Sequence, residues 1–266
     1  MSRTVKLMSR VLAVAIIAVV IDTTPAAYAQ QSTATTAISR GASSTTQTER
    51  LVDEAATPIV DLDTPLETSR NEARALKSKR YDHQHHILRN LPAGAGNVML
   101  PPPSADIADI PTSASDLIVE GVVTGSGAFL SNDRQSVYSE FTVRVTDIVM
   151  SRRGAGVRLG DAITAERWGG RVRYPDGRIV RYGMPGYGSP IIGVKYLLFL
   201  SNGDAGNYHV LTGYEIHGQT VRPLDGARIS YRGTWSCDRH RGQGYEDLRN
   251  EVAHAIVEDR VKEVSR

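Results

Sequence analysis

The sequence predicts a mainly β fold, in which a small antiparallel barrel is followed by one amphipathic helix. In 117–124 and 141–146 apolar and polar residues alternate, which is the period of a strand with one buried face. Further short apolar segments follow at close spacing with glycine and proline turns between them, as in small barrels. In 245–264 apolar residues recur at steps of three and four, which predicts an amphipathic helix.

The later strands are predicted from a turn sequence and from apolar runs. Residues 171–182 carry Pro-Asp-Gly at their centre, and this turn sequence predicts a hairpin. Residues 194–200 are apolar on both faces, so we expect this strand to be covered on both sides, with 245–264 as one of the covers. Additional short strands are expected at 162–168, 208–212, 214–216 and 220–222, with a turn near Gly213.

The first 29 residues have the three parts of a secretory signal peptide. Three basic residues precede an unbroken apolar run at 11–21, and the Ala-Tyr-Ala sequence at 27–29 matches the cleavage pattern. The apolar run has 11 residues, whereas a helix that spans a membrane needs about 20. We therefore expect cleavage before Gln30, export to the periplasm or the extracellular space, and no transmembrane anchor after cleavage.

Composition divides the rest of the chain into three parts. Residues 30–64 begin with a stretch rich in Ser, Thr, Ala and Gln, which has too little apolar surface to fold alone, so a disordered tether is predicted. Residues 65–114 combine a charged segment that has few apolar positions with a proline-rich segment, which predicts a loosely held helix and a semi-rigid linker. Residues 115–266 hold the predicted barrel domain and its C-terminal helix.

Charge and cysteine content limit the function classes. The formal net charge of +2 disappears when the three basic residues and one acidic residue of the leader are removed. A general attraction to nucleic acid is therefore not expected. Cys237 is the single cysteine, so no intramolecular disulfide can form. The sequence has no glycine loop of the kind that cradles phosphates, and no cofactor is expected.

Four segments resemble a family of uncharacterised exported bacterial proteins. They are 137–145 (VYSEFTVRV), 169–178 (GGRVRYPDGR), 193–200 (GVKYLLFL) and 211–215 (LTGYE). In strand order this region is also similar to the netrin-like OB barrel of the tissue inhibitors of metalloproteases. The resemblance implies an OB-like barrel. It brings no catalytic residues, because those inhibitors act through an N-terminal cysteine and several disulfides, and this chain has neither.

The densest group of candidate metal ligands lies in the charged segment and consists of Asp82, His83, His85 and His86. On a helix His83 and His86 would share a face, while His85 would point elsewhere. Asp82, His83 and His86 are thus the candidate set, which falls short of the four ligands of structural zinc. The alternative interpretation is a solvated polar stretch before the linker.

Cys237 is a candidate nucleophile, with His240 or His217 as its base. Such a pair would serve a cysteine-dependent hydrolase or transpeptidase. The local sequence lacks the histidine and glycine that precede the cysteine of L,D-transpeptidases, and it matches the Thr-x-Thr-Cys segment of sortases only in part. The alternative interpretation is a packed thiol without activity.

The hairpin at 171–182 is the main candidate for a binding site. It combines arginine forks, which pair with oxyanions, and flat rings, on which sugars stack. The candidate ligand-binding residues are Arg171, Arg173, Tyr174, Arg178, Arg181 and Tyr182. The alternative interpretation is an edge hairpin whose charges prevent aggregation.

Three functions follow from these observations. The leading hypothesis is a non-enzymatic exported binding module for an anionic polysaccharide of the cell envelope or for a protein partner. The second is the cysteine-dependent enzyme. The third is a structural protein of the cell envelope, in which the Ser/Thr-rich stretch acts as a spacer.

Overall fold

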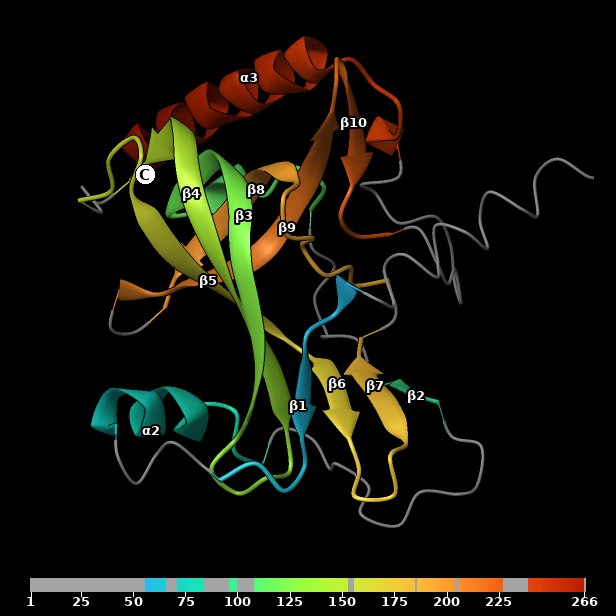
Figure 1. The fold of residues 1–266 in the computed structure, drawn as a ribbon. Helices are drawn as coiled ribbons and strands as arrows, with labels where there is room; N and C mark the ends of the chain where they lie inside the picture. The colour runs from blue at the N-terminus through green and yellow to red at the C-terminus, as the bar shows by residue number, and fades with distance from the viewer. Residues whose placement is uncertain are drawn as a thin grey trace, which may run out of the picture. The chain divides into compact units, whose positions relative to one another are not determined.

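The computed structural model is mainly β and has a C-terminal helix, as the sequence predicts, and its strands form two sheets where the sequence predicts a single barrel (Figure 1). It describes residues 56–65, 71–83, 96–99, 108–152, 156–184, 186–203, 206–226 and 239–265. These residues belong to one compact unit, Ala42–Arg266. The predicted signal peptide, the Ser/Thr-rich stretch, His85, His86 and Cys237 lie outside the described residues. Among the described helices, none is both long enough and apolar enough to span a membrane.

The larger sheet has six strands: β3 (Leu117–Leu130), β4 (Val137–Ser151), β5 (Ala162–Trp168), β8 (Lys195–Asn202), β9 (Tyr208–His217) and β10 (Thr220–Pro223). Their order is β10-β9-β5-β4-β3-β8, and β8 also pairs with β9. The pairing of β5 with β9 is parallel and the others are antiparallel. Pairing therefore runs from β3 through β4, β5, β9 and β8 back to β3.

β3 and β4 form a ladder that is longer than the alternating pattern predicts. A single turn of 3₁₀ helix, η2 (Thr112–Ala114), leads into β3. The register of the two strands shifts at three places within 118–125. Each shift moves following side chains relative to the partner strand. The buried positions of β3 therefore change from odd-numbered residues such as Val123 to even-numbered residues such as Ala128 and Leu130, so the alternation of 117–124 does not continue in phase to the end of the strand.

β9 corrects the prediction of a turn near Gly213. The strand is continuous from Tyr208 to His217 and passes through this glycine. The backbone of Gly213 lies against β8, because a Cβ there would be 2.8 Å from Leu198 Cδ2 and 3.0 Å from Leu197 O. Close approach of two strands, rather than a turn, is the reason for glycine at this position.

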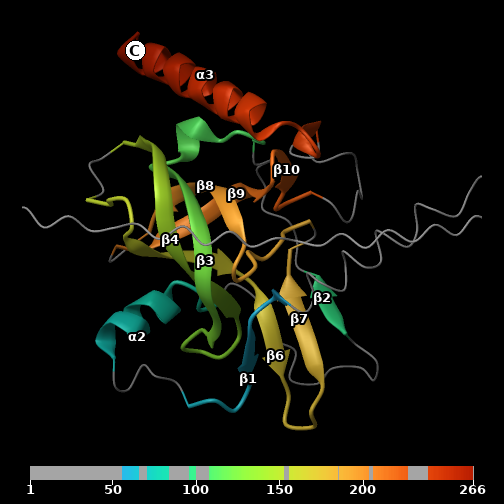
Figure 2. The same cartoon turned by 45° about the horizontal axis from the view of Figure 1, so that its top comes forward.

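Two clusters of buried side chains cover the two faces of β8. One cluster joins Leu198 to apolar residues of β3, β4, β5 and β9. The other joins Leu197 and Phe199 to Leu248 and Val252 of α3 (Tyr245–Val264). The prediction that the C-terminal helix covers this strand is therefore confirmed. In Figures 1 and 2, α3 and the short helix α2 (Glu72–Lys79) lie at opposite ends of the sheet.

The smaller sheet is built on the predicted hairpin. β6 (Gly170–Arg173) and β7 (Ile179–Gly183) pair antiparallel, which confirms the hairpin. Gly177, with φ of 83°, provides the left-handed residue of the turn. β1 (Ile59–Asp61) and β2 (Asn97–Met99) pair in parallel with its two edges, so the order is β1-β6-β7-β2. The sequence patterns predict neither β1 nor β2, because a strand of three residues has no recognisable period.

Charge, rather than an apolar stripe, holds α2 against the larger sheet. Arg74, Lys77 and Arg80 recur at three-residue steps. They contact Glu140 of β4 and Glu166 of β5, which lie directly opposite each other. Glu166 is fully buried, and Arg80 donates two hydrogen bonds of 3.0 Å to it. Two carboxylates placed like this would repel each other, and the two cations of α2 together with Arg80 at its C-terminal cap offset this repulsion.

Candidate functional site

The strand register places three arginines of the hairpin on one face of the smaller sheet. Arg171 lies directly opposite Arg181, and Arg173 lies opposite Ile179. Because side chains alternate along a strand, these residues share a face. We call the surface formed by Arg171, Arg173 and Arg181 the arginine face. The structure therefore brings three of the six candidate binding residues together.

Tyr174 and Tyr182 lie on the other side of the sheet, where they are buried. Their side chains are 5% and 2% exposed, and their hydroxyls are hydrogen-bonded to each other. They pack with Leu130 and Val137 from β3 and β4, and burial raises the pKa of Tyr174. Rings buried in this way cannot stack on a ligand. This finding corrects the expectation that arginines and tyrosines form one surface.

Main-chain carbonyl groups orient two arginines of the face. Arg171 Nε donates a 2.7 Å hydrogen bond to the carbonyl oxygen of Thr57, just before β1. Arg181 Nη2 donates a 3.2 Å hydrogen bond to the carbonyl oxygen of Tyr187. These two bonds help to fix the direction of each guanidinium group.

Exposed carboxylates accompany the other two arginines of the hairpin. Arg173 Nη1 lies 3.0 Å from Asp61 Oδ1, with side chains that are 49% and 56% exposed. Arg178 Nε lies 2.6 Å from Asp176 Oδ2 in the turn. The backbone N–H of Arg178 also donates to Asp176, which lowers the pKa of that carboxyl. Water screens ion pairs that are this exposed, so an external anion can compete for either arginine.

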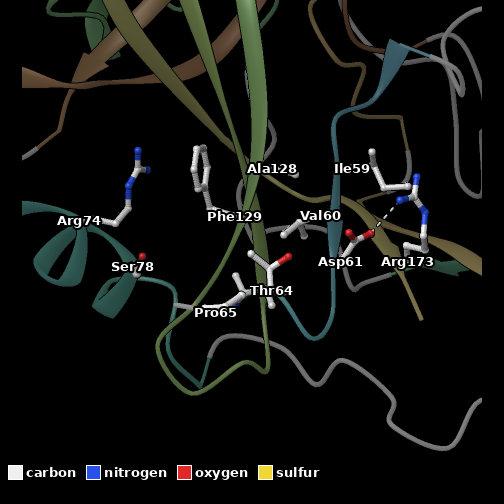
Figure 3. A pocket seen from close by; sticks show the side chains of 11 residues that line it. Ile59, Val60, Asp61, Thr64, Pro65, Arg74, Ser78, Ala128, Phe129 and Arg173 are labelled. Carbon is white, nitrogen blue, oxygen red and sulfur yellow. Dashed lines mark hydrogen bonds and ion pairs between the residues drawn. The ribbon is translucent and has the colours of Figure 1, made fainter. Parts of the chain in front are cut away.

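A cavity of about 330 Å³ adjoins the arginine face (Figure 3). It lies between β1, α2 and the end of β3. Arg173 and Asp61 line one end of the cavity, Arg74 lines the other, and apolar side chains such as Val60 lie between them. None of the sequence patterns indicates this cavity, because its walls come from four separate segments of the chain.

A buried ion pair fixes the segment 186–190 beside the arginine face. Arg167 Nη2 lies 2.7 and 2.6 Å from the two carboxylate oxygens of Asp225, and the side chains are 4% and 5% exposed. Arg167 also donates to the carbonyl oxygen of Gly188, and Asp225 accepts from the N–H of Gly188. The guanidinium group lies 4.6 Å from the ring centre of Tyr187. Since Tyr187 also accepts the bond from Arg181, the buried pair helps to position the face.

His240, the candidate base, is buried among polar groups, and both of its ring nitrogens are engaged. Nε2 lies 3.1 Å from Asp109 Oδ2, and Nδ1 lies 2.5 Å from Gln243 Oε1. A general base needs one ring nitrogen directed at its nucleophile, whereas these contacts connect the segment before η2 with the start of α3. His217, the other candidate base, is exposed. Cys237 lies outside the described residues, so its catalytic role stays a prediction.

The candidate metal ligands that the structure describes contact Asp133. His83 Nδ1 lies 3.2 Å from Asp133 Oδ2, and Asp82 Oδ1 accepts a 3.1 Å hydrogen bond from the backbone N–H of Asp133. Within the described ranges, no group of three or more His, Cys, Asp or Glu side chains is placed to hold a metal ion. His86 lies outside those ranges, so the metal site that would include it stays a prediction.

The resemblance to exported bacterial proteins and to netrin-like barrels stays a prediction. No protein-family model, curated protein or solved structure matches the chain.

Proposed function

We propose that this chain is a non-enzymatic exported binding module that holds an anionic polysaccharide of the cell envelope on its arginine face. One observation carries the proposal: three arginines share one face of a sheet whose other face is buried. Guanidinium groups pair with carboxylates through two parallel hydrogen bonds. Because strands and carbonyl contacts hold these groups in position, binding costs little side-chain entropy.

An OB-type barrel is the proposed frame that presents this face. The pairing that runs from β3 through β4, β5, β9 and β8 back to β3 supports it, since OB folds are barrels of five strands. The hairpin of β6 and β7 follows β5 in the chain and precedes β8. The hairpin is therefore an insertion between two strands of the proposed barrel. Substitutions on the surface of the hairpin would leave the side chains of the barrel core unchanged.

Export is the part of the proposal that brings the face to the envelope. The pattern of residues 1–29 supports a cleaved leader. Within the predicted tether at 30–64, Ile59–Asp61 instead form β1 of the smaller sheet, so only the part of the chain before β1 would serve as a tether. Mass spectrometry of the protein from the exporting cell should give a chain that begins at Gln30. A chain that keeps residues 1–29 in the cytoplasm would contradict export.

The test compares two variants that lose the same number of positive charges. The face variant replaces Arg171, Arg173 and Arg181 by glutamine. The control variant replaces Arg144, Arg158 and Arg260, which are exposed on other parts of the chain, by glutamine. Both are applied to immobilised polygalacturonate and eluted with salt, after circular dichroism has shown that they are folded.

The face variant should elute at a lower salt concentration than the control variant, because it lacks the oriented guanidinium groups. Equal elution of the two variants would show that retention follows net charge alone. That outcome would refute the proposed face.

A further inference from the structure

The cavity beside the arginine face shares Arg173 with it, and Asp61 connects the two. Both residues line the cavity and lie opposite each other in the β1–β6 pairing. The cavity volume of about 330 Å³ is near the lower limit of small-molecule sites, so a ligand of about a dozen non-hydrogen atoms fits. One sugar ring with its substituents has this size.

The lining suits a ring that is apolar on its faces and polar on its rim. Val60, Ala128 and Leu130 supply apolar surface, and Thr64 supplies a hydroxyl at an exposed position. Figure 3 shows Thr64 beside Val60, between the end formed by α2 and the end formed by Arg173. A pyranose ring can place its C–H groups against the apolar residues and its hydroxyls toward the polar ones.

Arg173 is the cation in the lining that a ligand can reach. Arg74, at the other end, is paired with Glu140 and lies 3.9 Å from the ring centre of Phe129. Its position is therefore set by the contacts that hold α2. Arg173 instead contacts Asp61 in a pair that is about half exposed. The side chain of Asp61 shows that a carboxylate fits against Arg173 at this end of the cavity.

We propose that the cavity binds one carboxylate-bearing sugar unit of the anionic polymer, with the carboxylate of the sugar replacing that of Asp61 on Arg173. This inference rests on the proposed function and deepens it, because it names a uronic acid as the ligand unit. Asp61 is then a competitor within the chain. It occupies Arg173 when no polymer is bound and lowers the affinity for the sugar.

A cavity-filling variant tests where the sugar binds. Isothermal titration calorimetry measures the binding of tetragalacturonate, with maltotetraose as the neutral comparison. Thr64→Trp fills the cavity and leaves the main-chain hydrogen bond from Thr64 N–H to Asp61 O in place. Thr146→Trp, at an exposed position of β4, is the matched control. Thr64→Trp should weaken tetragalacturonate binding by about tenfold or more, and Thr146→Trp should leave it unchanged.

Equal binding by the two tryptophan variants would overturn the assignment of the cavity. Maltotetraose binding as tight as that of tetragalacturonate would overturn the carboxylate contact. Either result could occur while polygalacturonate retention still depended on the arginine face, so these failures differ from a failure of the proposed function. Loss of tetragalacturonate binding in Thr64→Trp, together with unchanged retention of the face variant, would refute the face and also the contact between the sugar carboxylate and Arg173, because the face variant lacks Arg173.

Asp61→Asn tests the exchange of carboxylates. It frees Arg173 from its internal partner and should tighten tetragalacturonate binding by about two- to fivefold, the range expected for an exposed ion pair. Asp176→Asn removes the same charge from the pair with Arg178, which lies outside the cavity lining. Its effect should be smaller. Equal effects of the two variants would mean that each acts only through the net charge of the protein. This result would overturn the proposed exchange of carboxylates on Arg173.

Discussion

Arg167→Met breaks the buried ion pair from one side, because it keeps most of the side-chain length and removes the charge. Asp225 then keeps hydrogen bonds of 3.0 Å from Gly188 N and 2.9 Å from Thr212 Oγ1, but it loses both contacts with the guanidinium group. Both side chains of the pair are at most 5% exposed, so water cannot take the place of the lost partner. The free energy of unfolding should fall by about 3–5 kcal/mol.

Two further variants separate the buried charge from the lost packing. The double variant Arg167→Met with Asp225→Leu leaves no unpaired charge, so it should be more stable than Arg167→Met alone and lie within about 2 kcal/mol of the original protein. Arg173→Met breaks the exposed pair with Asp61 and should cost only about 0–1 kcal/mol.

Urea unfolding followed by tryptophan fluorescence measures all three variants, since Trp168 lies next to Arg167 in β5. A cost for Arg167→Met that is no larger than that of Arg173→Met would refute the reasoning. It would show that Asp225 is solvated after the change, contrary to its burial in the structure.

Three other predictions concern α3, acid stability and the thiol. Leu248→Ala, at a fully buried position of α3, should lower the free energy of unfolding by about 2–5 kcal/mol. Val257→Ala, on the exposed side of α3, should change it by less than about 0.5 kcal/mol. Similar values for the two variants would contradict the role of α3 as a cover of the sheet. Burial acts to raise the pKa of Glu120, but hydrogen bonds from β8 and α3 outweigh it and lower that pKa. The stabilisation by the Glu120 carboxylate is therefore present above the unfolded carboxyl pKa of about 4.3 and is lost as the pH falls through the lower folded pKa. In thermal melts, Glu120→Gln should lose less stability on acidification than the original protein. The same dependence of melting temperature on pH in both proteins would contradict the stabilising role of this carboxylate. Cys237 should react with iodoacetamide no faster than free cysteine near neutral pH, and faster labelling would favour the cysteine-dependent enzyme.

The elements with a strong local pattern could be predicted from the sequence. α3 spans the predicted 245–264, because apolar side chains at helical steps determine both its length and its buried side. The hairpin forms around Pro-Asp-Gly, where the turn residues themselves set the backbone angles. In both cases the residues that determine the structure are near neighbours in the chain.

The features that depend on distant partners could not be predicted. β1 pairs with β6 next to the bond from Arg171 to Thr57, which joins positions 114 residues apart. Alternation along the hairpin strands predicts that the arginines and the tyrosines lie on opposite faces of the hairpin. It does not predict which of the two faces is buried by other strands. The cover comes from β3 and β4, where Leu130 and Val137 pack on Tyr174 and Tyr182. The cavity likewise forms only when β1, α2, β3 and β6 have come together.

Salt dependence of polygalacturonate binding tests the arginine face most directly. If oriented guanidinium groups neutralise the carboxylates of the polymer, affinity should fall as salt rises, because ions compete for the same charges. The fall should be shallower in the variant that lacks Arg171, Arg173 and Arg181 than in the control that lacks the three exposed arginines elsewhere. The same salt dependence in both variants would show that the face does not contact the polymer, and it would contradict the proposed function.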